Sequence, residues 1–180
     1  MLCRKSLILA ALALGGLAAE RALAAPPQLL NKTIQFRWST EIVQRGPDGR
    51  IVRPRLDANR TVYVSSAGRL FMRASRENRR LRLKKGGDLA PDVTATKAGE
   101  ARGLRFVGAK LVGNVAFAQG AGQVTVSFDP SFSSCSLSII YGREGGGMRR
   151  RGLDGRMYDI QSITATGQSC SVREGNPFAE

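Results

Sequence analysis

Hydrophobic and polar residues alternate along several short stretches of the chain. Residues 34–39, 62–65, 69–73, 124–128 and 135–141 each repeat this pattern with a period of two. Alternation of this kind, in segments that contain Val, Ile, Thr and aromatic residues, indicates half-buried β-strands. No segment shows an apolar stripe at helical spacing. The pattern therefore predicts an all-β, single-domain antiparallel sandwich or small barrel of about seven to nine strands.

Turn-forming residues separate these stretches. Gly46-Pro47-Asp48-Gly49 indicates a turn, because Pro fixes φ and Gly adopts positive φ at low cost. Ser66-Ala67-Gly68 lies between two alternating stretches and predicts a hairpin. Residues 75–101 are polar and basic, and we expect a long basic loop there. Within them, Leu81 and Leu83 alternate with basic residues, which is the pattern of a strand with one cationic face.

The first 24 residues have the three regions of a secretory signal peptide. Arg4 and Lys5 precede an uncharged apolar run over residues 7–19, and Ala22-Leu23-Ala24 supplies the small residues of a cleavage site. The apolar run is shorter than the roughly 20 residues that span a bilayer, and no later stretch is long enough. We therefore expect cleavage after Ala24 and a periplasmic or secreted protein that does not span a membrane.

Cleavage would leave a mature chain with one disulfide. We expect a lead-in over residues 25–30, a β domain over residues 31–173 and a loose tail over residues 174–180. Two cysteines, Cys135 and Cys170, remain in this mature chain. An isolated pair in an exported protein most simply forms a structural bridge, and the spacing is unlike that of a redox motif. The bridge either joins two C-terminal strands or fastens the tail to the core.

Positive charge is the strongest chemical signal in the mature chain. The formal net charge of the full chain is +14, and the segment from Arg45 to Lys85 holds 13 basic and three acidic residues. An excess of this kind attracts anionic partners, although it is also typical of a solvated surface. The candidate binding residues form two clusters: Arg76, Arg79, Arg80, Arg82, Lys84 and Lys85 in the first, and Arg149, Arg150 and Arg151 in the second.

The class of anionic partner follows from the expected compartment. In a cell envelope, the available polyanions are anionic lipid, lipopolysaccharide and acidic cell-wall polymers. Nucleic acid is not expected, because the sequence has no recognition helix, zinc finger or aromatic stacking motif. The sequence thus favours a non-enzymatic protein that binds anionic envelope surfaces or polyanions through arginine.

Two other functions are kept as alternatives, and no motif identifies a known family. Phe36, Trp38 and Tyr63 could line an apolar cavity for a small ligand, as in lipocalin-like folds. A hydrolase would need paired carboxyl groups, for which the candidates are Glu144, Asp154 and Asp159. The chain has no histidine, which excludes histidine-based acid–base catalysis, Ser-His-Asp triads and nearly all ordinary zinc and copper sites. We expect no metal and no cofactor.

Overall fold

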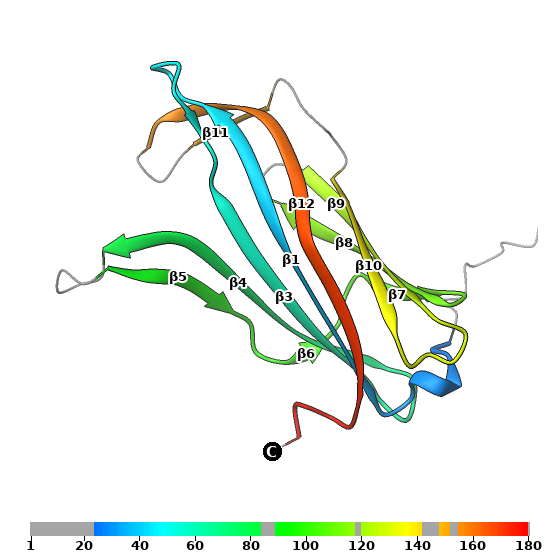
Figure 1. Cartoon of the computed structure of the whole chain (residues 1–180). Coiled ribbons are helices and arrows are strands. Elements are labelled where there is room, and N and C mark those ends of the chain that lie inside the picture. The colour runs from blue at the N-terminus through cyan, green and yellow to red at the C-terminus, as the bar shows by residue number, and fades with distance from the viewer. Residues whose placement is uncertain (1–23, 84–88, 118–119, 142–147, 152–154, 180) are drawn as a thin grey trace, which may run out of the picture.

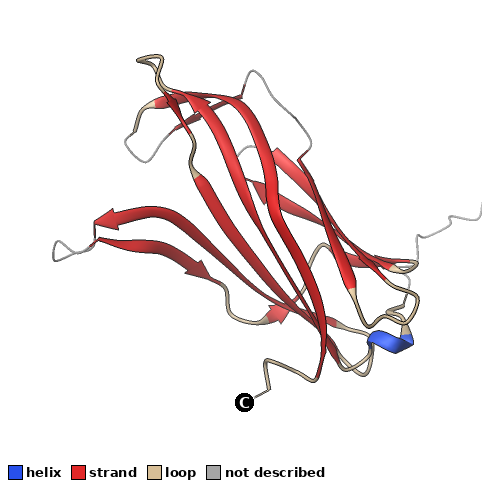
Figure 2. Ribbon diagram, in the orientation of Figure 1, coloured by secondary structure: helices blue, strands red, loops and turns tan. Residues whose placement is uncertain are grey.

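The chain folds almost entirely into β-strands (Figure 2). The computed structural model describes residues 24–83, 89–117, 120–141, 148–151 and 155–179, with side chains outside 76–94, 115–121 and 150. The expected signal peptide therefore lies outside the described residues, apart from Ala24. After a single turn of 3-10 helix, η1 (Pro27–Leu29), the described residues form the following strands: β1 (Lys32–Arg45), β2 (Ile51–Val52), β3 (Arg55–Val64), β4 (Leu70–Leu83), β5 (Leu89–Ala95), β6 (Gly99–Glu100), β7 (Leu104–Val107), β8 (Lys110–Phe117), β9 (Gly120–Phe128), β10 (Cys135–Tyr141), β11 (Met148–Arg151) and β12 (Met157–Glu174).

The strands pair in two antiparallel sheets, which confirms the predicted all-β class. The large sheet has eight strands in the order β11-β12-β1-β3-β4-β5, with β2 beside β1 and β6 beside β4. The small sheet has the order β10-β9-β8-β7 and lies behind the large sheet in Figure 1, whereas the β4–β5 hairpin extends to one side. The fold is thus a sandwich. The described residues form twelve strands, more than the predicted seven to nine, because four of the twelve are short strands of two to four residues (β2, β6, β7 and β11).

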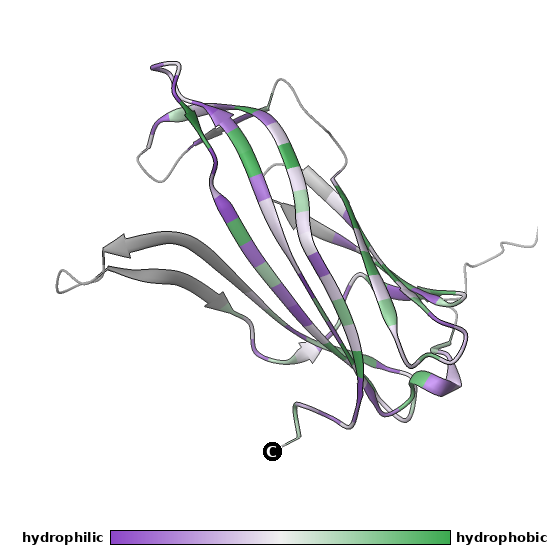
Figure 3. Cartoon of the chain, viewed as in Figure 1, coloured by the Kyte–Doolittle hydropathy of each residue, from purple (hydrophilic) through white to green (hydrophobic). Residues whose placement is uncertain are grey.

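Hydrophobic and hydrophilic residues alternate along the strands (Figure 3), and the buried apolar residues of the two sheets form one core cluster. On the large sheet, Ile34, Phe36 and Val62 are at most 2% exposed, and Leu111 and Val126 of the small sheet are fully buried. Burial of each such side chain stabilises the fold by about 1.5–3 kcal/mol. The predicted half-buried strands therefore supply the main core of the domain.

The Tyr141 hydroxyl of the small sheet is buried in this core, where it is hydrogen-bonded to two residues of β1 in the large sheet. The indole Nε1 of Trp38 donates a hydrogen bond to the Tyr141 hydroxyl at 3.0 Å, and the Thr40 hydroxyl shares a second hydrogen bond with it. Gly122 lies opposite Tyr141, and a Cβ atom there would come within 2.9 Å of the tyrosine ring. Glycine at this position therefore leaves room for the ring that carries the hydroxyl into the core.

Replacement of Tyr141 by phenylalanine is expected to destabilise the protein by about 1–3 kcal/mol, because it leaves the buried Trp38 N–H without its acceptor and the Thr40 hydroxyl without this partner. Urea unfolding monitored by tryptophan fluorescence measures the change. Tyr63→Phe is the matched control, since the Tyr63 hydroxyl bonds to Asn31 at the surface. A loss equal to that of the control would show that the buried hydroxyl is dispensable.

The predicted disulfide is present and links the two sheets. Cys135 is the first residue of β10, and its Cα lies 5.5 Å from that of Cys170 in β12. Because β10 belongs to the small sheet and β12 to the large one, the bridge closes one side of the sandwich. Of the two arrangements left open by the sequence, the bridge therefore joins two strands.

The predicted β3–β4 hairpin is confirmed, but the long loop after it is not. Val64 pairs with Leu70 across a turn in which Gly68 has a φ of +74°. Residues 75–101, expected as a loop, instead contain the end of β4 and the strands β5 and β6. Backbone pairing with β3 and β5 holds this polar segment in the sheet.

A network of hydrogen bonds on Asp129 closes the turn between β9 and β10. The carboxylate accepts hydrogen bonds from the Ser131 hydroxyl, from the Ser133 N–H at 2.8 Å and from the Ser134 N–H at 2.9 Å. These bonds, with that of the Ser131 side chain strongest, lower the pKa of Asp129 from 3.8 to about 2. The serine-rich segment after β9 therefore has a turn-forming role.

The Asp129 carboxylate is expected to contribute a pH-dependent part of the stability. Its folded-state pKa is lower than its unfolded value, so the contribution is complete above about pH 4 and disappears as the pH falls towards about 2. Thermal unfolding of the wild type and of Asp129→Asn across this range tests the effect. The wild-type melting temperature should fall more steeply with decreasing pH, and parallel curves would contradict the assignment.

Candidate functional site

The face of the large sheet that points away from the small sheet is polar and cationic. Paired residues of antiparallel strands lie on the same face, so the register aligns outward side chains in rows across β12, β1, β3 and β4. Three of these side chains are exposed arginines on three strands, Arg37, Arg73 and Arg173. We call this surface the arginine face and define it by Thr33, Gln35, Arg37, Asn59, Thr61, Arg73, Ser169, Ser171 and Arg173.

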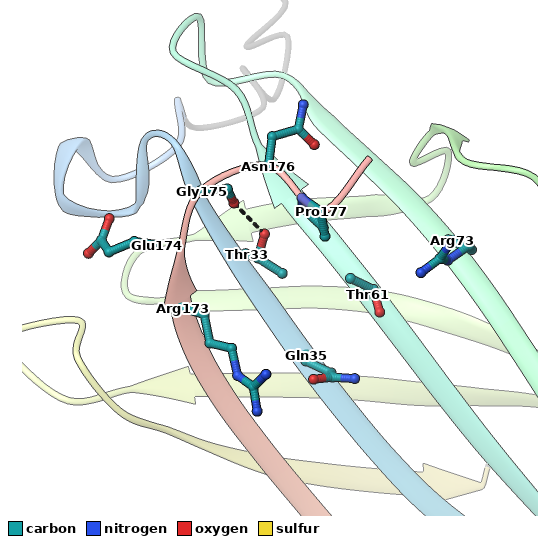
Figure 4. Close-up of a pocket in the computed structure, with 9 residues that line it drawn as sticks. All are labelled: Thr33, Gln35, Thr61, Arg73, Arg173, Glu174, Gly175, Asn176 and Pro177. Atoms are coloured by element: carbon teal, nitrogen blue, oxygen red, sulfur yellow. Dashed lines mark hydrogen bonds between the residues drawn. The ribbon is translucent and has the colours of Figure 1, made fainter. Parts of the chain in front are cut away.

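Two adjoining hollows lie on the arginine face. The first has a volume of about 270 Å³, and the second has a volume of about 350 Å³. Gln35 and Arg173 line both of them, so the hollows are neighbours on the sheet. In Figure 4, Arg173, Gln35, Thr61 and Arg73 project on one side of four neighbouring strands around the first hollow. The surface is therefore hollowed beside Arg37, Arg73 and Arg173.

The C-terminal tail forms a wall of the first hollow. The Thr33 hydroxyl donates a hydrogen bond to the Gly175 carbonyl at 2.7 Å (Figure 4), and the Gly175 N–H donates to the Asn31 carbonyl at 2.9 Å. The Arg73 guanidinium lies 5.6 Å from the centre of the Phe178 ring. The tail was expected to be loose, but these contacts hold it against the sheet through Phe178.

The three arginines keep their charge available for a ligand. In the described part of the chain none of them forms an ion pair, and Arg37 donates only to the Ser169 hydroxyl, at 2.9 Å. Glu174 lies 3.1 Å from Lys32 and Asp57 lies 3.5 Å from Arg55, whereas Glu41, further along β1 on the same side, has no ion pair in the described chain. The arginine face therefore has an uncompensated positive charge.

The structure separates the two clusters that the sequence singled out. Arg76, Arg79, Arg80 and Arg82 belong to β4, and Arg149, Arg150 and Arg151 form most of β11. Three strands, β12, β1 and β3, lie between β11 and β4. Arg149 pairs with Asp159 at 3.2 Å, which reduces its availability. Lys84 and Lys85 lie outside the described residues, as do the side chains of the four β4 arginines and of Arg150.

The residues of the two alternative functions are also dispersed. Phe36 and Trp38 stack within the core, whereas the register places Tyr63 on the opposite face of the sheet. These three residues therefore do not line one cavity. Of the three carboxyl candidates, Asp159 is paired with Arg149, and Glu144 and Asp154 lie outside the described residues. Within the described chain, no group of three or more potential metal ligands occurs.

Comparison of the chain with protein-family models, with curated proteins and with solved structures finds no match. Among the described residues, no helix is long and apolar enough to cross a membrane. Function must therefore be inferred from the chemistry of the surface itself.

Sequence reasoning did not identify the three arginines of this face. Each of them is isolated along the chain, since Arg37, Arg73 and Arg173 lie in different alternating stretches. The sequence feature that pointed to this face was the set of polar residues that alternate with apolar ones, such as Gln35 and Arg37 on one side of a strand. The polar residues of different strands come together on one face only through the pairing of the strands.

Proposed function

We propose that the mature chain is an exported, non-enzymatic protein that binds anionic polymers of the cell envelope through its arginine face. The observation that carries this proposal is the group of three exposed, unpaired arginines around two adjoining hollows. The planar guanidinium group donates paired hydrogen bonds to carboxylate and phosphate oxygens. Three such groups on three strands suit a ligand with several anionic groups in succession.

The chain's overall charge supports the same function. The full chain has a formal net charge of +14, and removal of residues 1–24, which hold three basic residues and one acidic residue, would leave +12. This excess creates a positive potential that raises the encounter rate with polyanions. The arginines of β4 and β11 add positive charge elsewhere on the large sheet, further along β4 and beyond β12. In this proposal they contribute to attraction, whereas the arginine face supplies the specific contacts.

The proposed location in the envelope is supported by two further observations. The Cys135–Cys170 disulfide is a bond that persists mainly in oxidising compartments. The first 24 residues carry the charge and hydrophobicity pattern of a secretory signal. An exported basic protein would meet lipopolysaccharide and acidic wall polymers there. A hollowed polar face suits a flexible polymer better than the flat surface of a lipid bilayer.

Binding of the mature, oxidised wild type to immobilised polygalacturonate, polyphosphate and neutral dextran tests this proposal across a salt series. We expect binding to at least one polyanion that weakens steeply as salt increases, because exposed charge contacts are screened. Dextran is the neutral control and should not bind. Absence of polyanion binding at low salt would mean that the arginines are only a solvated surface.

A further inference from the structure

The two hollows together are longer than one anionic group requires. Successive rows of outward side chains lie about 7 Å apart, because each row is two residues further along the strands. Arg173 belongs to the same row as Thr33, Arg73 to that of Gln35, and Arg37 to the third row. The three arginines therefore occupy three successive rows, on β12, β4 and β1, so a polymer that crosses both hollows would meet positive charge at three separate points.

Uncharged hydrogen-bonding groups lie between the arginines. In the described structure, the side chains of Gln35, Thr61 and Ser171 line the hollows and have no hydrogen-bond partner. The Oδ1 atom of Asn59, in the second hollow, is a buried acceptor that is also without a partner. Amide and hydroxyl groups both donate and accept hydrogen bonds, so they can bind the hydroxyl groups of a sugar.

The composition of the hollows is less suited to other polyanions. None of the residues that line them is aromatic, whereas proteins that bind single-stranded nucleic acid stack bases on aromatic side chains. The large hydrophobic side chains that are exposed in the described chain lie away from this face, at Ile51, Val107, Ile140 and Met157. The exposed large hydrophobic side chains thus lie outside the arginine face, and the Phe178 ring beside it lies against Arg73.

We infer that the ligand of the arginine face is a linear acidic polysaccharide, with carboxylate groups bound by the arginines and intervening hydroxyl groups bound by Gln35, Asn59 and Thr61. This inference rests on the proposed function and narrows it to one class of polymer. A uronic acid polymer has this alternation of carboxylates and hydroxyls along its chain. Polyphosphate has similar charge but no hydroxyl groups, so the two polymers separate recognition of hydroxyls from attraction between charges.

The test compares the affinities of the wild type for oligogalacturonate and for polyphosphate of matched charge at one salt concentration. The key variant is Gln35→Met with Thr61→Val, which removes hydrogen-bonding groups and leaves every charge in place. We expect its affinity for oligogalacturonate to fall about tenfold, the effect of losing one or two hydrogen bonds. Its affinity for polyphosphate should remain unchanged.

A matched control carries Gln123→Met with Thr125→Val, on the solvent-facing side of β9 in the small sheet. This control should bind both polymers as the wild type does, and thermal unfolding verifies that both variants are folded. Equal losses for the two polymers, no loss for either, or tighter binding of single-stranded DNA would overturn the polysaccharide inference while the proposed function stands. A wild type that binds none of these polymers would instead overturn the proposed function itself.

Discussion

Replacement of Arg37, Arg73 and Arg173 together by glutamine is expected to weaken binding of polygalacturonate about 10- to 100-fold at low salt. Exposed charge contacts are worth up to about 1 kcal/mol each, so three contacts amount to as much as about 3 kcal/mol, and about 1.4 kcal/mol corresponds to a factor of ten. Because none of the three is ion-paired in the described structure, their removal leaves no unpaired carboxylate behind. Isothermal titration calorimetry or biolayer interferometry measures the effect.

The matched control replaces three arginines away from the arginine face, Arg53, Arg102 and Arg105. All three are exposed and none is ion-paired within the described residues. This variant has the same net charge as the first, so any shared loss of affinity reports general attraction. We expect the control to retain most of the wild-type affinity. Equal losses in the two variants would show that binding depends on total charge and has no site.

Removal of the Cys135–Cys170 disulfide, by replacing both cysteines with alanine, is expected to lower the free energy of unfolding by about 3–4 kcal/mol. The bridge closes a loop with a sequence separation of 35, and the loss of such a constraint increases the entropy of the unfolded chain. Domains of this kind are stable by only about 5–15 kcal/mol, so the expected loss is a large share of the total. Urea unfolding of the oxidised wild type and of the variant measures it.

The reduced wild type provides the second measurement for this prediction. Unfolding in the presence of a reductant should reproduce the lower stability of the double variant without any change of sequence. If the double variant does not fold, the reduced wild type should likewise fail to refold after denaturation. A change of less than 1 kcal/mol in both measurements would contradict a stabilising role for the link between the sheets.

The fold was largely predictable because one sequence signal, alternation with a period of two, determines which side chains are buried. The stretch from Ile34 to Trp38 and the hairpin around Gly68 both fold as that signal predicts. The signal was weaker in residues 75–101, where basic residues hide an alternation that includes Leu81 and Leu83. Backbone pairing with neighbouring strands holds this segment in the sheet, and the amino-acid composition of a segment gives little indication of such pairing.

The candidate site was harder to predict because it depends on contacts between distant segments. Arg37 and Arg173 are separated by most of the chain, and they share a face only because β1 pairs with β12. Local clusters such as Arg149 to Arg151 are conspicuous in sequence, yet the described structure pairs Arg149 with Asp159. The density of charge along a chain therefore does not identify the charges that a fold gathers around two adjoining hollows.

The most direct test of the arginine face is a map of amide chemical shifts in the mature protein during titration with oligogalacturonate. Binding at the proposed site predicts that the largest shifts belong to Gln35, Arg37, Thr61 and Ser171, in β1, β3 and β12. Amides on the solvent-facing side of the small sheet, such as that of Gln123, should change little. Shifts centred on β11, on the β4–β5 hairpin or on the small sheet would contradict the assignment of the binding site.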